Sequence, residues 1–143
     1  MAWPKETDPE QNLRLEIKAL LESRGLEIAL PKDRVSPKIH VRVLEVEETR
    51  TAINHVDPET GKRCDWQNWE VTLDVVGDDR TPQGQLSKAS SVLFAAFRED
   101  AWEERNEHGI CTATLRKESN AQSEYGELKN PFIMKCDTIT FIE

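Results

Sequence analysis

Hydrophobic residues spaced three and four positions apart form the first regular pattern in the chain. Four of them fall on one side of a helix: Leu13, Ile17, Leu20 and Leu21. Asp8 and Pro9 are typical of a helix start, because the carboxylate accepts hydrogen bonds from free N–H groups and proline suits the first turn. Gly25 can adopt the positive φ that ends a helix. We therefore predict a helix over residues 9–24, preceded by a flexible arm at residues 1–7.

Alternating apolar and polar residues predict two long strands after this helix. The first covers residues 39–53, where the adjacent apolar pair Val43 and Leu44 indicates either a β-bulge or a switch in which face of the strand is buried. The second covers residues 69–75, with four side chains facing inward: Trp69, Val71, Leu73 and Val75. A shorter alternation at residues 26–30 fits either a short strand or an extended connector.

Residues 54–68 lie between these two strands and contain turn-forming sequence. Asp57-Pro58 and Gly61 favour a change of chain direction. We predict that residues 54–68 form an extended hairpin loop, a long arm between the strands. Trp66 stands there among polar residues, where a large amphipathic ring is typical of an interface. The alternative, that Trp66 folds back over its own sheet, is equally open.

The second half of the chain contains one more helical pattern and two more strand patterns. Thr81-Pro82 is typical of a helix start, and the apolar stripe after it predicts a helix over residues 82–102. We expect this helix to fray in the charged residues 103–105. Segments rich in threonine and isoleucine predict strands at residues 110–116 and 132–142.

Together these elements indicate a single α+β domain spanning residues 1–143. Long connections and two hairpins favour a mostly antiparallel sheet of about four strands, with two helices packed on one face and the long hairpin arm beside it. A chain of 143 residues is long enough to bury one hydrophobic core.

Charge and composition narrow the classes of function. Nineteen basic and 27 acidic residues give a net charge of −8, and the pI is about 5.0. This balance argues against a protein that grips nucleic-acid phosphates. We find neither an apolar run near the roughly 20 residues of a membrane helix nor a secretory leader, so we expect no membrane partner. The odd number of cysteines argues against a disulfide framework, and we expect structural thiols at Cys64, Cys111 and Cys136.

The residue types that most often perform chemistry form no recognisable set. Three histidines lack a partner at metal-ligand spacing and are expected to be solvated or half-buried: His40, His55 and His108. Glycine-rich phosphate loops and nucleophile motifs are also missing from the sequence. We therefore expect no enzyme activity, no metal and no cofactor. One catalytic alternative is a small metal-dependent nuclease that uses Asp74, Asp78 and Asp79, although carboxylates at a strand end more often serve turns and solvation.

The order of the elements resembles that of the tail terminator, or tail completion, proteins of long-tailed bacteriophages, among them the lambda-like minor tail proteins. The resemblance covers most of the chain and rests on the helix Leu13–Arg24 with the strands Pro37–Val43 and Trp69–Val75. It continues through the helix Leu86–Phe97 and the closing strand Thr138–Ile142. The resemblance consists of the order of the elements and their general sequence pattern, and it includes no residue-level motif.

The resemblance implies a structural virion protein. Such proteins form a ring, usually of six copies, that caps the tail tube, stops its growth and docks to the head. The implied partners are other copies of the chain, the tail tube protein and a head-closure protein. The implied location is the neck of the virion, after synthesis in the bacterial cytoplasm. DNA would pass through the lumen without specific binding, which fits an acidic chain because like charges repel.

A closed ring needs contact between two different patches of each subunit. The arm and an exposed sheet edge are the natural candidates, since an edge strand offers unpaired N–H and C=O groups. We therefore predict Arg50, Arg63 and Trp66 as subunit-interface residues, against the alternative that they are ordinary loop residues. Three other functions stay open: another head–tail connector such as a head-closure or tube protein, the nuclease, and a monomeric module that binds a host protein through Trp66.

Overall fold

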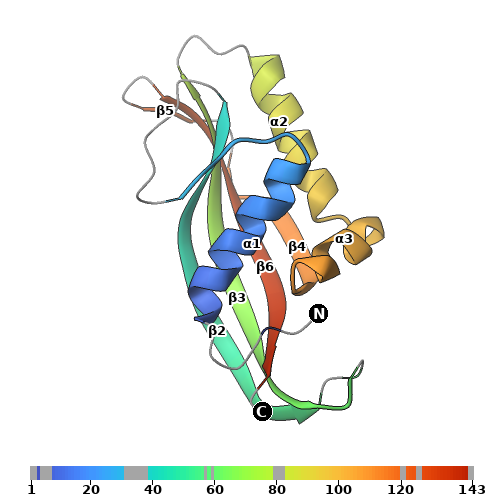
Figure 1. The fold of residues 1–143 in the computed structure, drawn as a ribbon. Helices are drawn as coiled ribbons and strands as arrows, with labels where there is room; N and C mark the ends of the chain where they lie inside the picture. The colour runs from blue at the N-terminus through green and yellow to red at the C-terminus, as the bar shows by residue number, and fades with distance from the viewer. Residues whose placement is uncertain are drawn as a thin grey trace.

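The computed structural model describes residues 3, 8–30, 39–56, 58, 60–78, 83–119, 122–124 and 127–141. Its helices are α1 (Pro9–Ser23), α2 (Gln83–Ala96), the short 3₁₀ helix η1 (Glu99–Ala101) and α3 (Trp102–Glu107). Its strands are β1 (Ile28–Ala29), β2 (His40–Val56), β3 (Arg63–Asp78), β4 (Ile110–Lys117), β5 (Gln122–Glu124) and β6 (Glu127–Phe141). Figure 1 shows the three helices on the near side of a long, twisted sheet.

The first helix forms as its sequence predicts. The Asp8 side chain accepts hydrogen bonds from the backbone N–H groups of Glu10 and Gln11, at 3.1 and 3.4 Å. Gly25 follows the helix with φ of +85°, a conformation that an L side chain rarely adopts. The four predicted apolar residues are fully buried: Leu13, Ile17, Leu20 and Leu21.

The α+β class is confirmed, and the described residues form six strands where about four were expected. The strand order is β1-β2-β3-β6-β4, and β5 pairs with the end of β6. β1 runs parallel to β2, whereas the other pairs are antiparallel. The additional strands β1 and β5 contain only two and three residues, which is too few for alternation to be a useful signal.

The strands β2 and β3 are longer than expected. β2 continues to Val56 and β3 begins at Arg63, so most of the expected loop at 54–68 is paired strand. Polar residues alternate with apolar ones along this part of β3. β6 pairs with β3 as far as Cys64. Of the two explanations for the change of phase at Val43 and Leu44, the bulge is confirmed, because the β2–β3 register shifts between Val43 and Glu45.

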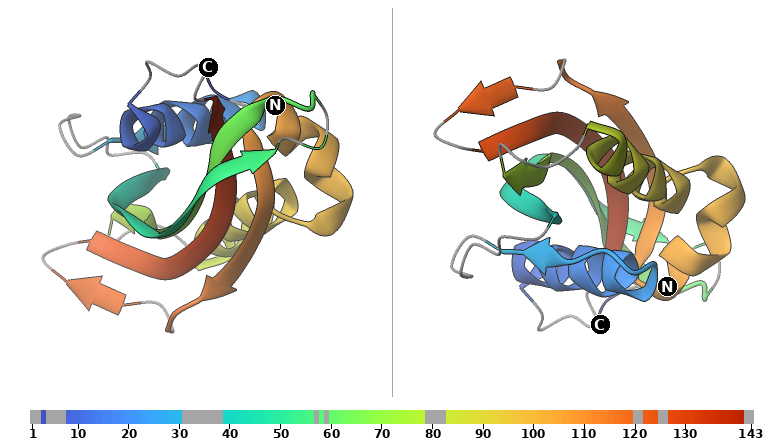
Figure 2. Two further views of the ribbon diagram at one scale, coloured as in Figure 1. Left: turned by 90° about the horizontal axis from the view of Figure 1, so that it is seen from below. Right: turned by 90° about the horizontal axis from the view of Figure 1, so that it is seen from above.

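One face of the sheet holds the hydrophobic core. The four residues of β3 that were predicted to face inward are buried: Trp69, Val71, Leu73 and Val75. Phe94 of α2 packs edge-on against Phe132 of β6, with ring centroids 5.3 Å apart. The strands curve around α1 (Figure 2), and α1 and α2 share a single buried cluster with the sheet. The opposite face of the sheet carries the other parity of side chains, which we call the helix-free face.

The second predicted helix is interrupted. α2 ends at Ala96, Arg98 is extended with φ −73° and ψ 156°, and η1 and α3 follow. The cause is Arg105, which is 3% exposed and donates hydrogen bonds to the carbonyl oxygens of Ala96 and Arg98. The Ala96 carbonyl is among those that a helix end leaves without an internal partner. The prediction of a continuous helix to residue 102 is therefore wrong, and residues 103–105, expected to fray, are helical.

The N-terminal segment has one described residue, Trp3, within the arm predicted at residues 1–7. Its indole is buried, and its backbone forms a parallel bridge to Thr140 of β6. The Trp3 N–H donates to the Ile139 carbonyl and the Phe141 N–H donates to the Trp3 carbonyl, both at 2.7 Å. Residues 1, 2 and 4–7 and the predicted helix start Thr81-Pro82 lie outside the described residues.

Candidate assembly surface

Three strands run on past the helical layer at one end of the sheet. β6 reaches Phe141, opposite Cys64 of β3, whereas β4 begins only at Ile110, opposite Thr138. The β2–β3 hairpin closes this end at the bottom of Figure 1. We use the name "hairpin end" for residues 50–56 of β2 and residues 63–66 of β3. All three residues predicted for an interface, Arg50, Arg63 and Trp66, lie in it.

Trp66 is a half-buried residue of β3 and does not lie in a loop. It pairs with Ala52 and Ile139, and its ring packs on that of His55, with centroids 4.8 Å apart and planes tilted by 52°. Its indole Nε1 is buried and has no hydrogen-bond acceptor among the described residues. The geometry favours the alternative that Trp66 folds back over its own sheet, and its role in an interface stays a prediction.

Arg50 and Arg63 are exposed but do not form a cluster. Arg50 follows a bulge in β2 and pairs with Asn68, whereas Arg63 starts β3 and pairs with Val56. Five residues of strand separate Asn68 from Arg63, a distance of roughly 17 Å at the usual rise. The two guanidinium groups therefore mark different points along one hairpin.

Two apolar residues of the hairpin end are strongly exposed, although neither was among the interface residues predicted from the sequence. Ile53 is 72% exposed and Val56 is 56% exposed. Large exposed apolar side chains that lie near one another are typical of contact surfaces. The sequence predicts a strand as far as Ile53, but it does not show that the helices stop short of this point.

The turn of the hairpin is fixed by local contacts. Gly61 has φ of +70°, and the Lys62 ammonium lies 5.4 Å from the centre of the Phe141 ring. The buried Cys64 thiol donates to the His55 carbonyl at 3.4 Å. None of the three cysteines is in a disulfide, and burial raises the pKa of Cys136 far above its ordinary value. His55 and His108 are half-buried, as expected, but His40 is fully buried.

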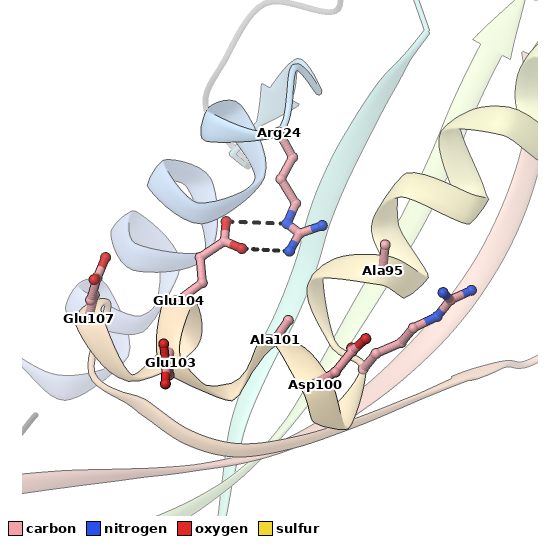
Figure 3. A pocket seen from close by; sticks show the side chains of 8 residues that line it. Arg24, Ala95, Asp100, Ala101, Glu103, Glu104 and Glu107 are labelled. Atoms are coloured by element: carbon pink, nitrogen blue, oxygen red, sulfur yellow. Dashed lines mark hydrogen bonds and ion pairs between the residues drawn. The ribbon is translucent and has the colours of Figure 1, made fainter.

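A hollow lined by carboxylates lies between α3 and the end of α1, with a volume of about 450 Å³ (Figure 3). Arg24 donates two hydrogen bonds to the Glu104 carboxylate, at 3.2 and 2.5 Å, and this interaction lowers the pKa of Glu104. Asp100, Glu103 and Glu107 line the rest, as does Arg98. Carboxylates outnumber guanidinium groups here, so the hollow repels phosphates more than it attracts them.

The carboxylates proposed for a nuclease are not brought together. Asp74 is buried on the helix-free face opposite Arg42, and burial raises its pKa against the opposing effects of Lys129 and Arg42. Asp78 follows four residues later on the same strand, about 13 Å away at the usual rise, which is too far to share one metal ion. The side chain of Asp78 and all of Asp79 lie outside the described residues. Within the described ranges, no three metal-binding side chains are close enough to form a site.

Comparison with known proteins leaves the family open. No protein-family model and no curated protein matches this sequence. Among the helices that the structure describes, none is long and apolar enough to cross a membrane.

Proposed function

We propose that this chain is a structural protein of a long-tailed bacteriophage, which assembles into a ring that terminates the tail tube and joins it to the head. The resemblance implies a ring of six copies, with DNA passing through its lumen. The observation that supports this proposal most is the hairpin end. It is a paired strand surface beyond the helical layer, and it exposes Ile53, Val56 and two arginines.

The element order also supports the proposal. A helix, two long paired strands, a second helix and two further strands follow one another as the resemblance requires, in one α+β layer. The sheet is open, and an open sheet ends in two different edges. A ring requires contact between two different surfaces of each subunit, so this architecture supplies the surfaces that such an assembly needs.

The charge distribution fits a lumen through which DNA slides. The net charge is −8, and the hollow at α3 adds a local concentration of carboxylates. A wall of this sign does not retain phosphates, because no counterions are released from DNA when it passes.

The decisive experiment measures mass and tube capping together. Native mass spectrometry and negative-stain microscopy are applied to the purified chain, alone and with tubes assembled from the tail tube protein of the same genome. We expect a ring, or a monomer that forms a ring on the tube end, and tubes that stop growing when the chain is added. A chain that stays monomeric and leaves tube growth unchanged would contradict the proposal.

The same preparation tests the nuclease alternative. We expect no cleavage of DNA or RNA in the presence of Mg²⁺ or Mn²⁺. Cleavage that requires the metal and is lost in Asp74→Asn would favour the nuclease over the ring.

A further inference from the structure

Apart from the two-residue strand β1, the sheet ends in two different strands, β2 and β4, which lie at its opposite sides. β1 covers only Val41 and Arg42 of β2, so the described chain pairs with the rest of β2 on one side alone. β4 pairs with β6 and with no other described strand. Unpaired edges of this kind offer backbone N–H and C=O groups to an additional strand.

The exposed side chains on the two edges have opposite charge. β2 exposes Glu45, Glu47 and Glu48, and β4 exposes Arg116 and Lys117. The register places the β2 pair Glu45 and Glu47 on the helix-free face, as it does Arg116, since their cross-strand partners Thr72 and Ile133 are opposite each other. Glu48 and Lys117 share the other face by the same alternation. The two edges therefore carry opposite charge, and Glu45, Glu47 and Arg116 lie on the same face of the sheet.

An apolar groove accompanies the β4 edge. Residues 111–115 of β4 form it together with η1 and α3, and its volume is about 630 Å³. Phe97, Trp102 and Leu115 line it, and Trp102 is 54% exposed. A tryptophan left this exposed beside an open strand edge lacks the cover that such a ring normally has.

We propose that the β2 edge of one copy pairs with the β4 edge of the next copy, so that the sheet continues from subunit to subunit. The inference rests on the proposed ring and names the two surfaces that form it. β2 and β4 run in opposite directions within the sheet, because three successive antiparallel pairs separate them. Copies related by rotation about an axis along the strands therefore present an antiparallel pair.

The lengths of the two strands agree with this pairing. A register with Glu45 opposite Arg116 sets Val46 opposite Leu115 and leaves Glu47 as the diagonal neighbour of Arg116. In the direction of the hairpin end, β2 continues to Val56, past the point where β4 begins at Ile110. The exposed Ile53 and Val56 then pass Ile110 and approach α3, where Trp102 is exposed. The hairpin end of one copy thus meets the apolar groove of the next.

Reversal of the charges on each edge tests the pairing. One variant is Arg116→Glu with Lys117→Glu, and the other is Glu45→Lys with Glu47→Lys. We expect each alone to raise the dissociation constant of the assembly at least tenfold, because like charges then face each other. An equimolar mixture should assemble again into rings that contain both variants, since every contact between unlike copies is again between opposite charges. A misfolded variant could not be rescued by mixing, so rescue separates charge complementarity from a folding defect.

Matched controls reverse exposed charges on the helices, with Lys88→Glu and Glu22→Lys, and should assemble like the unmodified chain. Rings that form normally from both edge variants would overturn the edge pairing and leave the proposed function standing. An effect of the β4 variant without an effect of the β2 variant would mean β4-to-β4 contact and would equally overturn it. Failure of the unmodified chain to form rings, with or without tubes, would remove the proposed function as well.

Discussion

Gly109 and Trp3 allow a direct test of how the N-terminal segment is held. Gly109 has φ of +77°, and a Cβ placed on it would overlap the Trp3 indole. That indole is a rigid ring, 5% exposed, whose backbone is fixed to β6 by two hydrogen bonds. Gly109→Ala therefore imposes two penalties, a left-handed backbone on alanine and the displacement of a buried tryptophan.

The size of the two penalties follows from a matched control. Gly25 has φ of +85°, and a Cβ added there meets nothing within 4 Å, so Gly25→Ala carries the backbone penalty alone, about 1–2 kcal/mol. Loss of a buried tryptophan side chain costs about 3–5 kcal/mol, and partial displacement costs about 3 kcal/mol on the same scale. We expect Gly109→Ala to lower the free energy of unfolding by about 4 kcal/mol. At roughly 3 °C per kcal/mol for a chain of this size, its Tm should fall roughly 10 °C below that of Gly25→Ala.

Urea denaturation and thermal melts of both variants, each also in a Trp3→Ala background, complete the double-mutant cycle. Without the Trp3 indole, Gly109→Ala should cost only what Gly25→Ala costs, because no ring is left to displace. Equal destabilisation by Gly109→Ala and Gly25→Ala in the otherwise unmodified chain would refute the packing of Trp3 against Gly109.

Three further predictions concern single side chains. Arg105→Met keeps the buried stem but removes the hydrogen bonds to Ala96 and Arg98. The free energy of unfolding, measured by urea titration, should therefore fall by about 2 kcal/mol. An unchanged value would mean that Arg105 does not stabilise the helix break. Burial raises the pKa of Asp74, so its protonated form stabilises the fold below the ordinary pKa of 3.8 and this stability is lost as the pH rises through the raised pKa. Asp74→Asn should therefore raise the Tm at pH 7 and give no gain at pH 3.5, and an equal gain at both would contradict the shift. Trp66→Phe removes a buried Nε1 that lacks an acceptor and should change the free energy of unfolding little. Trp66→Ala should lower the free energy of unfolding by about 2 kcal/mol. An unaffected Trp66→Ala variant would restore the interpretation of Trp66 as a contact residue.

Local pattern predicts the parts of this fold that local physics determines. The first helix, its aspartate cap and its terminal glycine depend on neighbours within four residues. The change of phase after Val43 is visible in the apolar alternation, and the strand register shows that a bulge causes it. The inward face of β3 follows from alternation alone, since its buried residues are the larger apolar ones.

Two predictions failed because distant residues decide the outcome. The helix break depends on Arg105, whose guanidinium donates to the Ala96 carbonyl nine residues earlier in the chain. The helix propensity of residue 97 does not predict this break. The hairpin was expected to open at residue 54 because Asp57-Pro58 and Gly61 are strong turn signals. Those signals set where the chain reverses and do not set how far the flanking strands stay paired, which here depends on β6 reaching Phe141.

The candidate surface was only partly visible in the sequence for the same reason. Arg50 and Arg63 were predicted because they lie on or beside the expected arm, whereas Ile53 was expected at the end of a strand and Val56 within a loop. Whether an apolar strand residue is buried depends on what lies over it. Here the helical layer ends before the hairpin does, and only the arrangement of the elements in space reveals that.

The two sheet edges differ in a way that bears on how the chain avoids aggregation. Exposed edges normally invite indiscriminate pairing, and charged residues and bulges are common defences. β2 has both, with register shifts beside Glu45 and Arg50 and glutamates along its exposed length. Such an edge repels a second copy of itself but admits a basic strand, and β4 ends in Arg116 and Lys117. The same residues that prevent β2-to-β2 pairing therefore favour a directional contact, and a directional contact between unlike surfaces is what closes a ring.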